Sequence, residues 1–125
     1  MRKWKVIYYE TTKKECYVQD FIDSVNKRNQ AKILALIGAL EEHGINLHRP
    51  YTDILRDGIH ELRLKLSGRQ VRVLYFFRYQ KYIILTHAFV KTTGRIPKQE
   101  IEKAIGYRED FFKRFNEKKI KELLK

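Results

Sequence analysis

The sequence is poor in the features that mark secreted and membrane-bound proteins. Its 125 residues include one cysteine, Cys16, so an internal disulfide framework is excluded. No apolar run approaches the length of a membrane span, and the N-terminal segment lacks the apolar core of a signal peptide. These absences fit a reducing compartment, and we expect a cytoplasmic protein with no membrane partner.

Metal and cofactor sites have no sequence signal either. The histidines, His43, His48, His60 and His87, show no metal-ligand spacing with one another or with Cys16. The six glycines form neither a dinucleotide-binding pattern nor a P-loop, and no Gly-x-Ser-x-Gly nucleophile motif occurs. We therefore expect no metal and no cofactor, which leaves charge stabilisation and proton transfer by ionised side chains as the available chemistry.

Basic residues are abundant and unevenly distributed. The chain has 27 Lys and Arg against 15 Asp and Glu, a formal net charge of +12. Residues 1–62 carry ten basic and nine acidic residues, whereas residues 63–125 carry seventeen and six. This asymmetry predicts that the C-terminal half binds a polyanion, most often nucleic acid, although an acidic protein would satisfy the same charge.

Residues 58–91 organise the rest of the chain, because they predict a three-stranded antiparallel meander. Aliphatic and aromatic residues dominate the stretch, and turn signals interrupt it at Ser67-Gly68 and at Gln80-Lys81. Two-residue loops at both places define cross-strand pairs, namely Arg63 with Arg72, Glu61 with Leu74, Arg72 with Phe89 and Leu74 with His87.

This register sorts the side chains of the meander onto two faces. One is a core face of Leu62, Leu64, Val71, Val73, Tyr75, Phe77, Ile84, Thr86, Ala88 and Val90. The other carries Glu61, Arg63, Lys65, Arg72, Leu74, Phe76, Leu85, His87, Phe89 and Lys91. Like charges directly opposite destabilise a sheet, so Arg63 across from Arg72 predicts either a surface network neutralised by Glu61 or a site for phosphate.

The segments before the meander predict one strand and two helices. Residues 3–10 predict the strand, and the capping-box spacing of Thr12 and Glu15 predicts the start of the first helix. After a break at residues 26–29, a second helix is predicted to end at Gly44. Its apolar stripe consists of Ala31, Leu34, Leu36, Ile37 and Leu40.

The segments on either side of the meander complete the predicted fold. Residues 45–57 predict a connection, and a helix is predicted to begin near Pro97. We expect one domain over residues 1–107, with residues 108–125 as a basic amphipathic helical extension of the same domain. The predicted class is α+β, with an N-terminal strand and two helices packed on an antiparallel sheet of about four strands, followed by a C-terminal helix.

From residue 4 to residue 107 the chain resembles the RelE/ParE superfamily of bacterial toxins, above all its HigB-like branch of phage-derived Gp49-like proteins. The resemblance rests on five segments: Asp57-Gly58-Ile59-His60-Glu61-Leu62-Arg63, Arg72-Val73-Leu74-Tyr75, His87-Ala88-Phe89-Val90-Lys91, Ile96-Pro97 and Glu100-Ile101-Glu102-Lys103-Ala104. Two positions depart from the family pattern, because an aromatic residue is common at His60 and a second lysine is frequent at Thr92.

The resemblance implies a RelE-like fold and the toxin of a type II toxin–antitoxin system. Such a toxin is an mRNA interferase, an endoribonuclease that cleaves mRNA in the ribosomal A site beside rRNA. The resemblance also implies a cognate helix-turn-helix antitoxin similar to HigA, which holds the toxin inactive. It carries functional roles over to Arg63, Arg72 and Lys91.

The candidate catalytic residues are Arg63, Arg72, Lys91, His87 and Glu61. Metal-independent attack by a 2′-hydroxyl needs cations around the phosphorane and a group that moves protons. Arg63 and Arg72 would hold the non-bridging oxygens, and Lys91 would stabilise charge or protonate the leaving 5′-oxygen. Either His87 or Glu61 is the candidate base, although His87 is equally explained as a buried, hydrogen-bonded histidine.

The candidate RNA-binding residues are Lys65, Phe89, Arg95 and Lys98. Phe89 would stack a splayed base, unless it belongs to the core. Competing interpretations remain open at this point: a non-catalytic basic binding module, a ParE-like toxin that acts on a protein target, and an inactive phage remnant.

Overall fold

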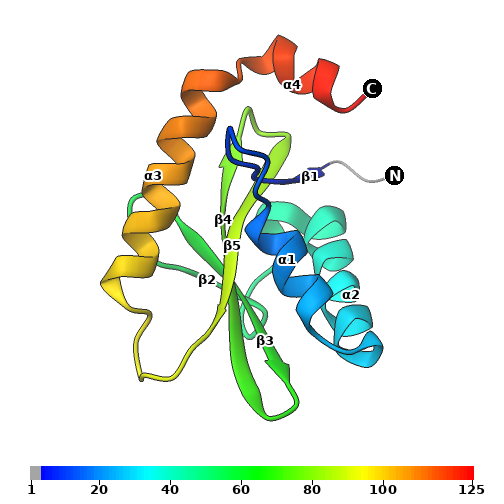
Figure 1. Cartoon of the computed structure of the whole chain (residues 1–125), viewed down its shortest axis with the longest axis vertical. Coiled ribbons are helices and arrows are strands. Elements are labelled where there is room, and N and C mark those ends of the chain that lie inside the picture. Colours follow the sequence, from blue (N-terminus) through cyan, green and yellow to red (C-terminus); the bar gives the residue numbers. More distant parts are fainter. Residues whose placement is uncertain (1–3) are drawn as a thin grey trace.

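The computed structural model describes residues 4–125 and has α+β architecture, with helices on both faces of one sheet (Figure 1). The strands are β1 (Lys5–Tyr8), β2 (Thr52–Ile54), β3 (His60–Leu66), β4 (Arg69–Arg78) and β5 (Tyr82–Val90). The helices are α1 (Tyr17–Ser24), α2 (Lys27–His43), the short 3-10 helix η1 (Gly44–Asn46), α3 (Lys98–Arg114) and α4 (Glu117–Leu123). Lys3 of the predicted first strand lies outside the described residues.

The sheet has five strands in the order β1-β5-β4-β3-β2, one more than the predicted number of about four, and it is mixed, whereas an antiparallel sheet was predicted. β1 runs parallel to β5, and the other neighbours are antiparallel. β2 comes from a segment predicted to be a connection. Its three residues pair with the start of β3, but they are too few to show the alternation that identifies a strand in sequence.

The β3–β4 hairpin has the predicted turn and register. Ser67 and Gly68 both have positive φ, at 50° and 81°, as a two-residue primed turn requires. The turn sets Arg63 opposite Arg72 and Glu61 opposite Leu74, which confirms the predicted pairs.

The β4–β5 pairing confirms the prediction only on one side of a β-bulge. Arg72 pairs with Phe89 and Leu74 pairs with His87, as predicted, but Tyr75 pairs with Leu85 and leaves Thr86 as the extra residue. Beyond the bulge the register differs by one residue.

Beyond the bulge, the faces predicted for the residues of β5 and the predicted position of the second turn are wrong. Leu85 belongs to the core on the α1–α2 side, and Ile84 belongs to the core on the α3 side, the reverse of the prediction. The positive φ values of the second turn lie at Tyr79 and Gln80, one residue earlier than predicted. Thr86 is fully buried, and its hydroxyl donates to the Leu74 carbonyl at 3.1 Å.

Helices α1 and α2 cover one face of the sheet (Figure 1). α1 begins at Tyr17 and not at the predicted capping box, because the Thr11 hydroxyl accepts the amides of Lys13 and Glu15 and forms a separate turn. α2 begins after Asn26, whose side chain accepts the amide of Asn29 at 2.9 Å.

The buried side of α2 differs from the predicted stripe. Ile33, which the prediction left out, is buried with Ile37 and Leu40. Ala31 and Leu34 of the predicted stripe are exposed, Leu34 to 51%. Gly44 ends the helix as predicted, with φ of 52°. A Cβ at this position would lie 2.0 Å from Trp4 Nε1, so both the backbone angle and the packing require glycine.

Helices α3 and α4 cover the other face, which we call the α3 face (Figure 1). α3 follows Pro97 as predicted and continues through residues 107 and 108 to Arg114. Phe111 of α3 and Ile120 of α4 are buried against Phe76 and Ile84 of the sheet. The helices thus close one end of the α3 face, and charged residues occupy its other end.

Within residues 4–125, no helix is long and apolar enough to cross a membrane.

Candidate active site

Two arginines and one carboxylate meet at the open end of the α3 face. Arg63 of β3 and Arg72 of β4 are direct cross-strand partners. Glu61 Oε1 lies 3.4 Å from Arg72 Nε and 3.6 Å from Arg63 Nε. We call these three side chains the Arg–Glu–Arg cluster; its two guanidinium groups share one carboxylate, which leaves one positive charge in excess.

The cluster is buried on one side and open on the other. Glu61 and Arg72 are 5% and 3% exposed, whereas the Arg63 side chain is 35% exposed. Burial raises the pKa of the Glu61 carboxyl above its ordinary value, and the charges of Arg72, Arg63 and Lys91 oppose that rise. A charged ligand can therefore approach the cluster from the side of Arg63.

Arg72 has hydrogen-bonding capacity that its neighbours leave unused. Its Nη1 donates to the Val71 carbonyl at 3.0 Å, and its Nη2 donates to Gln70 Oε1 at 3.2 Å. Its buried Nε has no hydrogen-bond partner among the described residues, although Glu61 lies within ion-pair distance. Burial lowers the pKa of Arg72, an effect that Glu61 opposes. An anion oxygen would satisfy such a donor.

Lys91 lies beside the cluster. Its amide donates to the Gln70 carbonyl at 2.7 Å, which ties the end of β5 to the start of β4. Its ammonium group donates to the Gly94 carbonyl at 3.4 Å, and its charge opposes the rise that burial causes in the pKa of Glu61. Of the five predicted catalytic residues, Arg63, Arg72 and Glu61 thus lie together, and Lys91 is close enough for its charge to act on Glu61.

His87, the fifth, belongs to a different group of contacts. Its Nε2 lies 3.4 Å from Oε1 of Glu100 on α3, and its Nδ1 lies 3.0 Å from the Thr86 hydroxyl. Lys103 Nζ approaches the same Glu100 oxygen at 3.2 Å. Burial lowers the pKa of His87, Glu100 raises it and Lys103 lowers it. These contacts match the alternative of a buried histidine that joins β5 to α3.

Phe89 combines both roles considered for it. It is partly buried on the α3 face, and its ring stacks on that of His87 with centroids 5.5 Å apart. It is also the direct cross-strand neighbour of Arg72. Its remaining exposed surface is therefore next to the Arg–Glu–Arg cluster.

The other three predicted RNA-binding residues do not belong to the cluster. Lys65 is exposed on β3, two residues beyond Arg63 and paired with Gln70. Arg95 is exposed in the segment between β5 and α3. Lys98 begins α3, is 80% exposed and lies 3.8 Å from Glu102.

Sequence reasoning missed Gln70 and Glu100. Gln70 could have been found, because it lies two residues before Arg72 and hence on the same face of β4. Glu100 gave no signal, because its contact with His87 depends on how α3 packs against the sheet.

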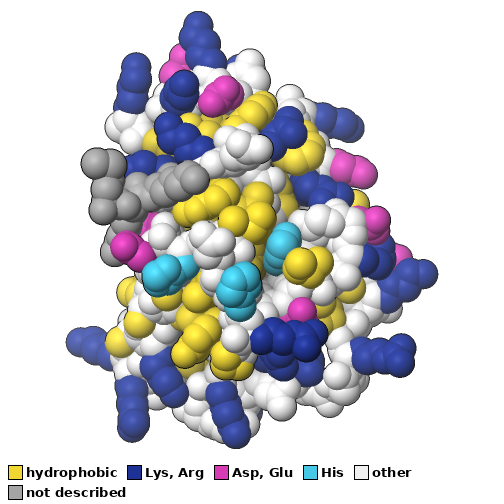
Figure 2. Space-filling view, turned by 180° about the vertical axis from the view of Figure 1, so that it is seen from behind, with side chains coloured by type: hydrophobic (Ala, Val, Ile, Leu, Met, Phe, Trp, Pro, Cys, Tyr) yellow, Lys and Arg dark blue, Asp and Glu magenta, His cyan; other side chains and the backbone are white. Residues whose placement is uncertain are grey.

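The exposed surface around the site is rich in basic side chains. Figure 2 shows one face on which hydrophobic and histidine side chains lie in the middle, with Lys and Arg side chains around them and some beside an acidic group. Within the described part of the chain, no group of three His, Cys, Asp or Glu side chains is placed to hold a metal ion. Two guanidinium groups, an ammonium group and a carboxylate can bind a phosphate and move a proton.

Comparison with known proteins identifies the family. No curated protein matches the chain. The family model of phage-derived Gp49-like proteins (DUF891) matches residues 20–109, which include α2, the whole meander and most of α3. The chain therefore belongs to the Gp49-like family of phage-derived proteins, a family of RelE/HigB-like toxins.

Proposed function

We propose that this chain is the toxin of a type II toxin–antitoxin system and cleaves translated mRNA as a ribosome-dependent endoribonuclease. The observation that carries the proposal is the Arg–Glu–Arg cluster, where Glu61 Oε1 lies within 3.6 Å of the Nε atoms of both arginines. Membership of a family of RelE/HigB-like toxins supports the same activity.

The proposed reaction is a metal-independent transesterification. Glu61 takes the proton of a ribose 2′-hydroxyl, and the 2′-oxygen attacks the adjacent phosphorus. Arg63 and Arg72 stabilise the non-bridging oxygens of the phosphorane, and Lys91 donates a proton to the leaving 5′-oxygen. The products are a 2′,3′-cyclic phosphate and a free 5′-hydroxyl.

Glu61 is a better base than His87 in this arrangement. Its pKa is raised by burial, which brings a carboxyl closer to the pH at which it must accept a proton. Its carboxylate also lies beside both phosphate-binding groups, whereas His87 Nε2 faces Glu100 on α3. His87 then acts as a positioning residue, because its ring supports Phe89.

The partners follow from the same proposal. The ribosome presents mRNA in its A site and holds the scissile nucleotide in line for attack, with rRNA as the surrounding surface. A cognate HigA-like helix-turn-helix antitoxin keeps the toxin inactive. The excess of positive charge, +12 over the chain, suits an RNA-rich environment.

The test is cleavage of a short mRNA on purified translating ribosomes, with and without the protein. New fragments with cyclic phosphate ends, formed in the presence of a chelator and only when ribosomes are present, are expected. Arg63→Ala and Arg72→Ala should abolish them, and Arg56→Ala, which removes an exposed arginine paired with Asp57, should not. Fragments that form only when a metal ion is present, or that form without ribosomes, would contradict the proposal.

One observation favours a second function, a non-catalytic basic module or a ParE-like toxin that acts on a protein target. Glu61 already pairs with both arginines, which is also how a purely structural network would look. Growth arrest without RNA fragments would support this alternative.

A further inference from the structure

Three adjoining hollows follow the turn of the β3–β4 hairpin from the start of α2 to Lys91. The first, of about 410 Å³, lies between α2 and the turn, and the second, of about 570 Å³, shares Asn29 and Ser67 with it. The third, of about 630 Å³, shares Arg69 with the second and is lined by Lys91. We call this depression the hairpin groove.

The hairpin groove is lined by charges of one sign. Its lining includes the basic residues Arg28, Lys32, Lys65, Arg69 and Lys91, and no carboxylate lines it within residues 4–125. None of these five cations forms a salt bridge in the described chain. Cations without counter-ions, gathered along a depression, attract a polyanion.

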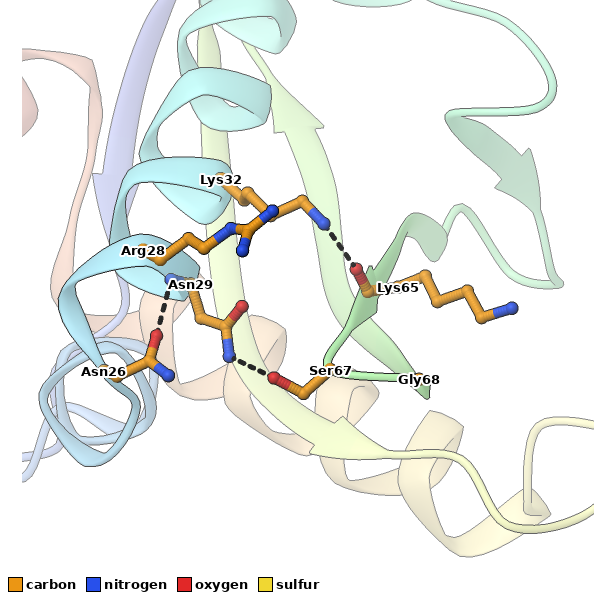
Figure 3. Close-up of a pocket in the computed structure, with 7 residues that line it drawn as sticks. All are labelled: Asn26, Arg28, Asn29, Lys32, Lys65, Ser67 and Gly68. Atoms are coloured by element: carbon orange, nitrogen blue, oxygen red, sulfur yellow. Dashed lines mark hydrogen bonds between the residues drawn. The ribbon is translucent and has the colours of Figure 1, made fainter.

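The first hollow is a fixed junction between α2 and the hairpin (Figure 3). The buried amide of Asn29 donates to the Ser67 hydroxyl at 2.9 Å, and Lys32 Nζ donates to the Lys65 carbonyl at 3.3 Å. Figure 3 shows Arg28 and Lys32 over the hollow, whereas the Lys65 side chain points away from α2. Lys32 is therefore held close to the hairpin, and Arg28 lies over the same hollow.

The third hollow continues to the candidate active site. Gln70 lines it, accepts a hydrogen bond from Arg72 and also accepts the Lys91 amide through its carbonyl. A nucleic-acid strand with one phosphate at the Arg–Glu–Arg cluster could thus continue its backbone along the basic hairpin groove. Because the groove continues to the cluster, the polyanion that binds at the cluster is a better candidate ligand for the groove than an unrelated acidic protein is.

We propose that the hairpin groove binds the backbone of single-stranded RNA on one side of the scissile phosphate, with Arg28 and Lys32 as its outer phosphate contacts. This inference rests on the proposed function, because it takes the cluster as the site of RNA cleavage. It extends the substrate site from the sheet to α2, a helix that was predicted only to pack on the sheet.

The test measures binding, so that it does not depend on cleavage. Fluorescein-labelled RNAs of about four and about twelve nucleotides are used, because single-strand sites span this range. All riboses carry 2′-O-methyl groups, which prevent attack by the 2′-oxygen. The wild-type protein should bind the longer RNA more tightly, since only that RNA can reach both the cluster and α2.

The decisive variant is the double substitution Arg28→Ala and Lys32→Ala. It should reduce the affinity for the longer RNA and lower the slope of log affinity against log salt by about 1.4, which corresponds to about 0.7 for each phosphate contact. Both positions are exposed on a helix that tolerates alanine, so the fold is kept. The matched control is Lys118→Ala with Lys119→Ala, which removes the same charge from exposed positions on α4.

The outcomes separate this inference from the proposed function. An unchanged salt slope in the α2 variant, or an equal decrease in the α4 control, would overturn the groove assignment. Polyglutamate binding that depends on Arg28 and Lys32 as strongly as RNA binding does would show that the groove recognises an acidic protein and would overturn the RNA assignment. Absence of cleavage with the predicted binding pattern would refute the proposed function alone.

Discussion

Arg63 and Arg72 face each other directly across β3 and β4, and one oxygen of Glu61 lies within 3.6 Å of the Nε atoms of both. Like charges at opposed positions destabilise a sheet. One carboxylate compensates one of the two guanidinium groups, and Lys91 adds a further positive charge nearby. We therefore expect an anion bound at the cluster to stabilise the folded chain.

Inorganic phosphate should raise the melting temperature of the wild-type protein more than sodium chloride of equal ionic strength does. A ligand present at a hundred times its Kd contributes about 2.7 kcal/mol to stability. The phosphate-specific shift should disappear in Arg63→Ala, because the exposed half of the anion site is lost. The measurement is thermal unfolding followed by circular dichroism over a phosphate titration.

The control for the phosphate experiment is Arg56→Ala. Arg56 is exposed and lies 2.6 Å from Asp57, so this variant removes an arginine without touching the cluster. It should keep the wild-type shift. Equal phosphate shifts in wild-type protein and in Arg63→Ala would contradict the anion site.

Glu61→Gln should lower the cleavage rate about a hundredfold to ten-thousandfold, the usual contribution of a general base. A base acts when deprotonated, so the wild-type rate should rise with pH and level off above the pKa of Glu61. Because burial raises this pKa, the rate should rise at a higher pH than the ordinary glutamate pKa of about 4.3 would give. Glu61→Gln should lack this rise in a pH–rate profile.

The same profile distinguishes the two bases considered from the sequence. If His87→Gln loses the pH-dependent rise and Glu61→Gln keeps it, His87 is the base and the present assignment is wrong. A glutamine at position 87 keeps a hydrogen-bonding side chain toward Glu100 and Thr86, so a loss of activity through loss of the α3 contact is minimised.

His87 should also make stability depend on pH. Burial lowers its pKa in the folded chain, below the value of about 6.5 in the unfolded chain. Above that pH the residue is neutral in both states and has no effect. As the pH falls from the unfolded pKa to the folded pKa, the unfolded chain binds the extra proton and the free energy of unfolding decreases.

Urea unfolding at a series of pH values measures this effect. His87→Gln should weaken the decrease, and a smaller dependence should remain because burial also lowers the pKa of His60. The double variant His60→Gln with His87→Gln should remove the remainder. An unchanged pH dependence in His87→Gln would show that His87 is not buried as described.

Gly44→Ala should destabilise the protein by about 2 kcal/mol or more, because φ is positive and the new Cβ would overlap the Trp4 indole. The control is Gly38→Ala in the middle of α2, where a Cβ has no heavy atom within 4 Å. That substitution should stabilise the helix by about 0.5–1 kcal/mol. Denaturant unfolding of both variants tests the pair, and equal losses would contradict the packing of Trp4 on Gly44.

The part of the site that could be predicted from sequence is the part fixed by a short turn. Ser67-Gly68 determines the register of β3 and β4, so the pairing of Arg63 with Arg72 follows from local chain geometry. The same turn would also have located Gln70. The turn and the alternation of side chains along each strand were enough to predict these contacts, because the paired residues lie close to the turn in sequence.

The rest depends on contacts that are distant in sequence. The bulge at Thr86 exchanges the faces of Ile84 and Leu85, and residues 82–90 read as an uninterrupted strand give no sign of it. The placement of Glu100 beside His87 follows from the packing of α3 on the sheet. Only the three-dimensional arrangement could therefore show that His87 and Glu61 lie in different groups of contacts.

The most direct test of the central claim is primer extension on a reporter mRNA in cells that briefly express the protein, beside an Arg72→Ala control. New 5′ ends inside the translated region are expected with the wild-type chain and should be absent with Arg72→Ala. The same ends in an untranslated copy of the message, or undiminished ends with Arg72→Ala, would contradict a translation-linked ribonuclease that acts through the Arg–Glu–Arg cluster.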